Sequence, residues 1–366
     1  MDGHSANPLL WEVAMNERIK WIDASKGFMI IFMLWSHSWK IFCDLSEAYF
    51  AQFPVFFHEY TRGFVGITGV ALYLLRGKLS AEQSLQKYCF RRGVKLIAVC
   101  LFIAIFFRVS FSHSLTLLKF DSVVASLVNF LIAGRSFGPE RFVVRIAVFI
   151  IFAGVLIRKS GLGTLLACIS AGSILLLARS HVYIPRSLET FDLSSYMLFD
   201  IYELFGITIA GIVGICIGVL IEHKYHWPRF ISKSFPYVCM LSVPFLLSYQ
   251  HVIAVPHLAG SIGDLLRIAF AICLGMLIAK RFPKTLSRII CTFGAYSLFV
   301  YVAHYELGFF VRQLLIKKNF LGINSFTDSL CASTCFVFLF LSMSAIIILR
   351  LKNKSLDTAM RKELGL

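Results

Sequence analysis

Residues 198–221 read LFDIYELFGITIAGIVGICIGVLI, and Asp200 and Glu203 are the only acidic or basic side chains in this stretch. About 20 mostly apolar residues in a helix suffice to cross the roughly 30 Å hydrocarbon core of a bilayer. Similar runs recur along the chain, in which 58% of the residues are hydrophobic and 15% are charged. Soluble proteins carry about 25% charged residues. The sequence therefore predicts an all-α, polytopic integral membrane protein, and it excludes a disordered chain, a disulfide-stapled secreted module and a compact cytosolic enzyme.

Ten apolar runs are predicted to span the membrane. They lie near Ile22–Cys43, Pro54–Leu75, Val94–His113, Phe142–Ile157, Leu162–Ala178, Leu198–Ile221, Pro236–Ala254, Ile262–Ala279, Ile289–Ile316 and Leu330–Leu349. An eleventh run, Phe120–Ala133, is shorter and contains Ser and Asn, and if it crossed, the basic clusters after Ile221 and Ala279 would face outward. The positive-inside rule opposes that arrangement. We therefore expect residues 114–140 to form an extracytoplasmic or re-entrant segment.

An even number of spans places both termini on one side, where most Lys and Arg residues then lie. This predicts a cytoplasmic segment over residues 1–21, a transmembrane domain over residues 22–350 and a basic cytoplasmic tail over residues 351–366. The net charge of +16 is then an orientation signal, and no nucleic-acid partner is expected. The ten cysteines show no metal-ligand spacing, so no metal site is predicted.

The first span carries Asp23, Lys26 and His37 among apolar neighbours, in the sequence WIDASKGFMIIFMLWSHSWK over residues 21–40. Lys26 and His37 are eleven residues apart, which places them on one helix face about 16 Å apart, and Asp23 lies one turn below Lys26. Asp23 also fits a helix cap, and Lys26 also fits a cation that snorkels to the headgroups. His37 is too far up the helix to reach cytoplasmic water, and a neutral imidazole is suited to general base catalysis on a hydroxyl.

A second imidazole lies in the ninth span, in GAYSLFVYVAHYELGFFVRQ over residues 294–313. Ser297, Tyr301 and His304 share one helix face, and His304 should lie at nearly the depth of His37. Such side chains either bind or activate a ligand, or they join helices by hydrogen bonds.

Two further segments offer candidate ligand contacts. Arg92 and Lys95 lie one turn apart at the start of the third span, where they either mark topology or hold a phosphorylated ligand from the cytosol. In TRGFVGITGVALYL, over residues 61–74, Gly66 and Gly69 belong to a stripe of small residues that favours helix packing and would also admit a slender ligand. Arg62 lies just inside that helix.

These segments together resemble the membrane acyltransferase-3 family and the related glucan-modifying and heparan-glucosaminide acetyltransferases. The family's first helix has a basic residue, a glycine and then a histidine, which Lys26, Gly27 and His37 match with Lys in place of the usual Arg. The similarity continues in order with Thr68 and Gly69, with Arg92 and Lys95, and with Gly294, Ser297, Tyr301 and His304.

The resemblance implies a bacterial inner-membrane enzyme that moves an acyl group, usually acetyl, from acyl-CoA to a hydroxyl of a polysaccharide, an oligosaccharide or a lipid-linked sugar. It implies no permanently bound cofactor, with acetyl-CoA or another acyl-CoA as co-substrate. The implied catalytic residues are His37, Lys26, Asp23 and His304; the CoA-binding residues are Arg92, Lys95, Gly66 and Gly69; and the acceptor-binding residues are Ser297, Tyr301 and Arg62. The alternative is a proton-coupled transporter or flippase of a sugar or lipid-linked precursor, in which intramembrane His and Glu side chains relay protons.

Overall fold

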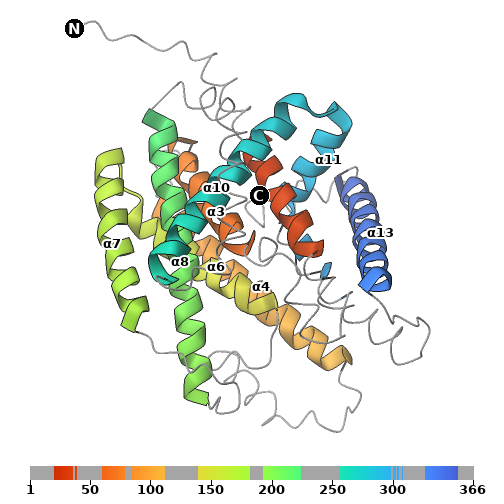
Figure 1. The fold of residues 1–366 in the computed structure, drawn as a ribbon, viewed down its shortest axis with the longest axis horizontal. Helices are drawn as coiled ribbons and strands as arrows, with labels where there is room; N and C mark the ends of the chain where they lie inside the picture. The colour runs from red at the N-terminus through yellow and green to blue at the C-terminus, as the bar shows by residue number, and fades with distance from the viewer. Residues whose placement is uncertain are drawn as a thin grey trace, which may run out of the picture. The chain divides into compact units, whose positions relative to one another are not determined.

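The structure is a computed structural model that describes residues 20–35, 38, 60–78, 85–111, 139–181, 193–223, 256–297, 300, 301, 303, 304, 307 and 326–352. Every regular element within these residues is a helix, which confirms the predicted all-α class (Figure 1). Three of the described helices are long and apolar enough to cross a membrane: Gly161–His181, Ile201–Glu222 and Cys331–Ile348. Two shorter apolar helices, Thr61–Leu75 and Phe142–Leu156, accompany them.

The helix bounds follow the apolar runs and extend beyond them into polar flanks. Residues 20–35 form the first described helix, and residue 38 is also helical. The others are α3 (Tyr60–Leu75), the 3-10 turn η2 (Arg76–Lys78), α4 (Leu85–Phe111), α6 (Pro139–Leu156), α7 (Gly161–His181), α8 (Leu193–His223), α10 (Pro256–Arg281), α11 (Lys284–Ala295) and α13 (Phe326–Lys352). The predicted span Pro236–Ala254, the segment 114–138 and residues 1–19 and 353–366 lie outside the described residues.

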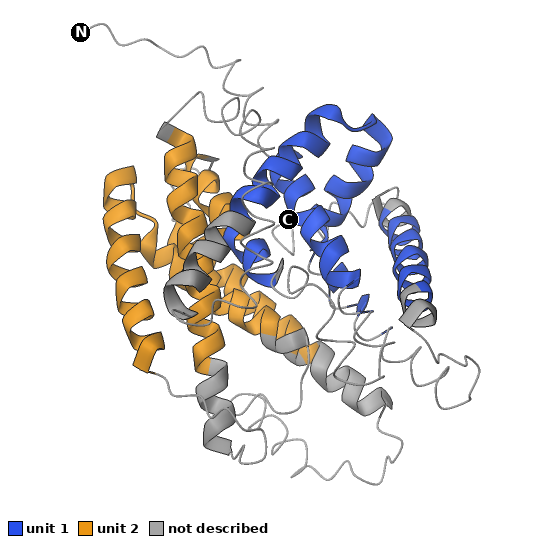
Figure 2. Cartoon of the chain, in the orientation of Figure 1, with its two compact units in different colours: residues 1–67, 225–251, 266–357 blue, residues 68–224, 252–265, 358–366 orange. Residues whose placement is uncertain are grey.

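The chain divides into two compact units (Figure 2). Unit 1 comprises residues 1–67, 225–251 and 266–357, and unit 2 comprises residues 68–224, 252–265 and 358–366. Helix α3 is shared, because its first half belongs to unit 1 and its second half to unit 2.

Large apolar side chains are exposed along α7 and α13. On α7, Leu162, Ile174 and Leu177 are 67%, 66% and 64% exposed, and on α13 Phe338 is 71% exposed. A soluble monomer rarely presents so much contiguous apolar surface to water. These faces are typical of helices that contact lipid.

In unit 2, helices approach one another closely at glycines, which have no side chain to hold the backbones apart. A Cβ placed on Gly69 of α3 would stand 3.0 Å from the backbone nitrogen of Ile215 and 3.2 Å from the carbonyl carbon of Gly211, both on α8. A Cβ on Gly154 of α6 would stand 2.8 Å from the Cβ of Cys89 on α4. The small residues therefore let backbones approach, as is common between membrane helices.

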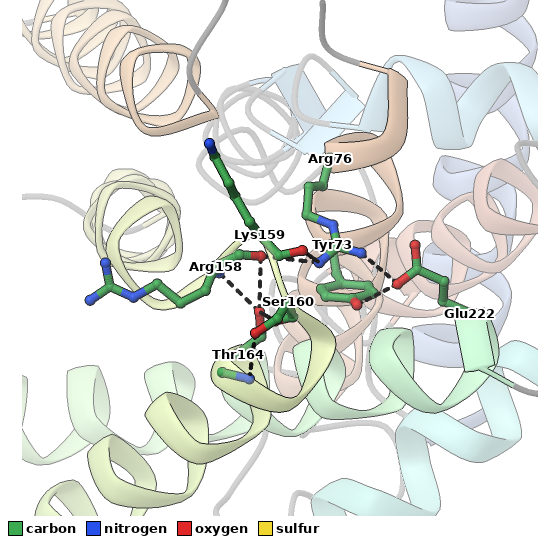
Figure 3. Close-up of polar contacts among 8 residues, drawn as sticks. Tyr73, Arg76, Arg158, Lys159, Ser160, Thr164 and Glu222 are labelled. Carbon is green, nitrogen blue, oxygen red and sulfur yellow. Dashed lines mark hydrogen bonds and ion pairs between the residues drawn. The ribbon is translucent and has the colours of Figure 1, made fainter. Parts of the chain in front are cut away.

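A polar cluster joins the C-terminal ends of α3, α6 and α8 (Figure 3). The Arg76 guanidinium donates to the backbone oxygens of Arg158 and Lys159, at 3.0 and 2.9 Å, and to the Glu222 carboxylate at 2.6 Å. The Tyr73 hydroxyl donates to the same carboxylate at 2.5 Å. Three chain segments that are predicted to be cytoplasmic therefore meet at one end of unit 2.

Candidate functional site

The helix of residues 20–35 crosses α11 in unit 1 at two glycines (red and light blue in Figure 1). A Cβ on Gly294 would stand 2.6 Å from the carbonyl carbon of Asp23 and 2.9 Å from the nitrogen of Gly27. A Cβ on Gly27 would in turn stand 2.9 Å from the carbonyl carbon of Ile290 and 3.0 Å from the nitrogen of Gly294. Helical Cβ atoms lean toward the N-terminus, and each glycine faces the residue four positions before its partner. The two helices therefore run parallel and in register at this crossing.

Helix α10 also packs against the helix of residues 20–35, at Trp21 and Ser25. A Cβ on Gly275 would stand 2.5 Å from the Trp21 carbonyl oxygen and 2.8 Å from the Ser25 nitrogen. The Ser25 hydroxyl donates to that carbonyl at 2.8 Å, so this buried polar side chain is satisfied within its own helix. Residues 20–35 are thus held between α10 and α11 with little freedom to rotate or slide.

The acid and the base predicted on the first span lie together at this crossing. Asp23 and Lys26 are both half-buried, and the ammonium of Lys26 acts electrostatically on the Asp23 carboxyl. The Cys291 thiol of α11 donates to the Lys20 carbonyl oxygen at 3.4 Å, which ties the beginning of the helix to α11. The predicted catalytic residue His37 lies outside the described residues. Ser38, one position further, is helical and fully buried, and its hydroxyl donates to the Leu34 carbonyl at 2.7 Å.

The second predicted imidazole is buried in unit 1. His304 has no exposed surface, and its ring lies 5.5 Å from the ring of Tyr301 and 6.2 Å from the ring of Phe340 on α13. Ser297 is 8% exposed and Tyr301 is 4% exposed. The predicted face is therefore buried, and it packs against a helix that the sequence did not associate with it.

Within the predicted ninth span, Ile289–Ile316, the regular helix is interrupted at one position. Helix α11 ends at Ala295, and Tyr296 has φ −103° and ψ 22°. The chain is helical again at residue 297, and the Val300 N–H donates to the Tyr296 oxygen at 3.0 Å. Hydropathy does not reveal this interruption, because Tyr296 lies within a predominantly apolar run.

The predicted CoA-binding residues are divided between the two units, with Gly66 in unit 1 and Gly69, Arg92 and Lys95 in unit 2. Arg92 of α4 is half-exposed and donates to the Tyr88 hydroxyl at 2.5 Å, and Lys95, one turn further, is exposed. Gly66 is buried in the unit 1 half of α3. At Gly69 the backbone of α8 fills the space that a ligand would need, so the interpretation of Gly69 as part of a ligand groove is corrected to helix packing.

Arg62, the remaining predicted acceptor contact, is 8% exposed in the first turn of α3. Sequence reasoning missed Gly275, which packs against the helix of residues 20–35, and Phe340, which packs against His304. Gly27 and Gly294 belong to separate motifs of the sequence. The signal that could have linked them is that each glycine precedes a histidine by ten residues.

No protein-family model matches this chain, and no curated protein matches it.

Proposed function

We propose that the protein is a membrane-bound O-acyltransferase that moves an acyl group, usually acetyl, from acyl-CoA to a hydroxyl of a cell-surface polysaccharide, an oligosaccharide or a lipid-linked sugar. One observation carries the proposal. The segments that hold the first and last motifs of the resemblance are far apart in the sequence, yet they cross directly through Gly27 and Gly294, a glycine of each motif.

The crossing supports a shared site because each of the two crossing glycines precedes a histidine in the sequence. His37 and His304 each follow their crossing glycine by ten residues, and ten helical residues rise about 15 Å. Parallel helices in register would therefore carry both imidazoles to a similar depth in the membrane. Charged and titratable groups at that depth are costly, and they are usually retained for function.

In the proposed reaction His37 removes the proton from the acceptor hydroxyl as its oxygen attacks the thioester carbonyl. The bond between the carbonyl carbon and sulfur then breaks, and the CoA thiolate leaves and takes up a proton. His304 with Tyr301 and Ser297 would bind the sugar, and Arg62 would contribute from α3. Asp23 and Lys26 would neutralise and orient the incoming donor, while Arg92, Lys95 and the Gly66 region would contact CoA.

The proposal includes a topology of ten spans in a bacterial inner membrane, with both termini in the cytoplasm. The meeting of the ends of α3, α6 and α8 at Arg76 and Glu222 supports it, because these ends belong to three different predicted cytoplasmic loops. The exposed apolar faces of α7 and α13 support the membrane setting.

The test is transfer of radiolabelled acetyl from acetyl-CoA into the glycan fraction by membranes that contain the native protein, His37→Ala or His181→Ala. His181 is the matched control because it is an exposed histidine at the end of α7. We expect label with the native protein and with His181→Ala, and none with His37→Ala at equal expression. Full transfer by His37→Ala would refute the role of His37, and substrate flux into proteoliposomes without any acyl donor would favour the transporter alternative.

A further inference from the structure

The turn between α10 and α11 concentrates positive charge at the base of the candidate site. Lys280 and Arg281 end α10, and Lys284 and Arg288 lie in the first two turns of α11; we call these four residues the basic turn. All four are exposed. We propose that the basic turn binds the phosphates of the nucleotide end of the acyl donor, the 3′-phosphorylated ADP of CoA. This inference rests on the proposed function.

The cations of the basic turn are available to a ligand. None of the four pairs with an acidic side chain in the part of the chain that the structure describes. Arg76, which ends a predicted span in the same way, is instead neutralised by Glu222 and by two backbone carbonyls. A topological signal requires cations at the end of a span, but it does not require that they remain unpaired. Clustered unpaired cations create a positive potential that attracts a polyanion.

An exposed aromatic ring lies inside the basic turn. Phe282 is 37% exposed between Arg281 and Lys284, and it belongs to neither helix. Bases stack on exposed aromatic side chains, and phosphates bind the cations around them. A ring flanked by cations therefore fits a nucleotide better than it fits inorganic phosphate alone.

The basic turn also lies where a donor would enter. Arg288 precedes Cys291 by one helical turn, and the Cys291 thiol donates to the Lys20 carbonyl at the start of the helix of residues 20–35. A nucleotide held at the turn would thus lie at the end of the helix from which Asp23 and Lys26 rise. Its acyl-bearing arm would point along that helix toward the depth at which the reaction is proposed.

The test measures equilibrium binding of radiolabelled adenosine 3′,5′-bisphosphate to the purified full chain in a neutral detergent. We compare the native protein with Lys284→Gln/Arg288→Gln and with Arg158→Gln/Lys159→Gln. The second pair is the matched control, because it removes two exposed cations from the α6–α7 turn of unit 2. We expect about tenfold weaker binding in the first variant, less than twofold change in the control, and weaker binding to the native protein at high salt.

Phe282→Ala should weaken binding of the bisphosphate severalfold while leaving the effect of salt unchanged, because the cations remain. Equal losses in the two double variants, or no loss in either, would overturn the proposal. So would a first double variant that loses only affinity for phosphatidylglycerol vesicles and keeps its affinity for the nucleotide. Binding needs no acyl transfer, so a protein that binds at the turn but transfers nothing would refute the enzyme and leave the binding site standing.

Discussion

Gly294→Ala should separate the two helices on which the proposed site is built. The added Cβ would stand 2.6 Å from the carbonyl carbon of Asp23 and 2.9 Å from the nitrogen of Gly27, whereas ordinary contacts begin at 3.4 Å. All of these atoms are backbone, so no side chain can rotate away. The helices must therefore move apart by at least about 0.8 Å, the difference between 3.4 and 2.6 Å.

The separation should reduce both stability and activity. Overpacking of a close interface costs about 1–3 kcal/mol, and a displacement of about 1 Å at a reacting group can cost about 100-fold in rate. We expect a lower thermal transition temperature for Gly294→Ala in detergent. At a temperature where the variant is folded, we expect kcat for acetyl transfer to fall about 100-fold with little change in KM for acetyl-CoA.

Two glycines that meet no backbone serve as controls. A Cβ on Gly77 would meet nothing within 4 Å, and a Cβ on Gly172 would meet only the Ile212 side chain, at 3.7 Å. Alanine at either position should leave stability and transfer close to native. The reasoning would be refuted if Gly294→Ala matched these controls in both measurements.

Four further predictions concern other parts of the chain. Arg76→Gln should destabilise the protein by about 1–2 kcal/mol, because it loses two hydrogen bonds to carbonyls and a partly exposed ion pair with Glu222; an unchanged unfolding midpoint would contradict this. Burial raises the pKa of Cys89 from 9.0 to about 11, so at pH 8 it should be alkylated far more slowly than an exposed thiol, and the rate should rise as the pH approaches 11. Arg92→Gln should slow that alkylation further, because the nearby guanidinium lowers the pKa of the thiol; a faster reaction would be inconsistent with this arrangement. His304→Phe should keep the ring packing and the fold but lose transfer, whereas transfer at the native rate would show that the ring nitrogens are dispensable.

The fold class could be predicted because hydropathy and helix length together determine it. The run Leu162–Ala178 corresponds to α7, which is Gly161–His181, and Phe142–Ile157 corresponds to α6, which is Pro139–Leu156. Helix α4 begins at Leu85, earlier than the apolar run at Val94, because its first turns are polar and extend beyond the hydrophobic stretch.

The site was only partly predictable, because its geometry depends on contacts between distant segments. The three-residue spacing of Tyr301 and His304 predicted that they share one helix face, and their rings do lie side by side. The pairing of Gly27 with Gly294 required knowledge of which helices are neighbours, which periodicity does not give. Gly69 is a second example. The small residues around it fit both a ligand groove and helix packing, and only the distance from Gly69 to the backbone of α8 distinguishes the two.

The most direct test of the central claim is the reaction itself, measured with purified protein in liposomes. Radiolabelled acetyl-CoA and a glycan acceptor would be supplied, and labelled product and free CoA thiol would be counted together. An O-acyltransferase predicts one free thiol for each acetyl group that becomes attached to the acceptor through an alkali-labile ester. Uptake of the glycan into the liposomes with neither thiol release nor labelled product would contradict the account.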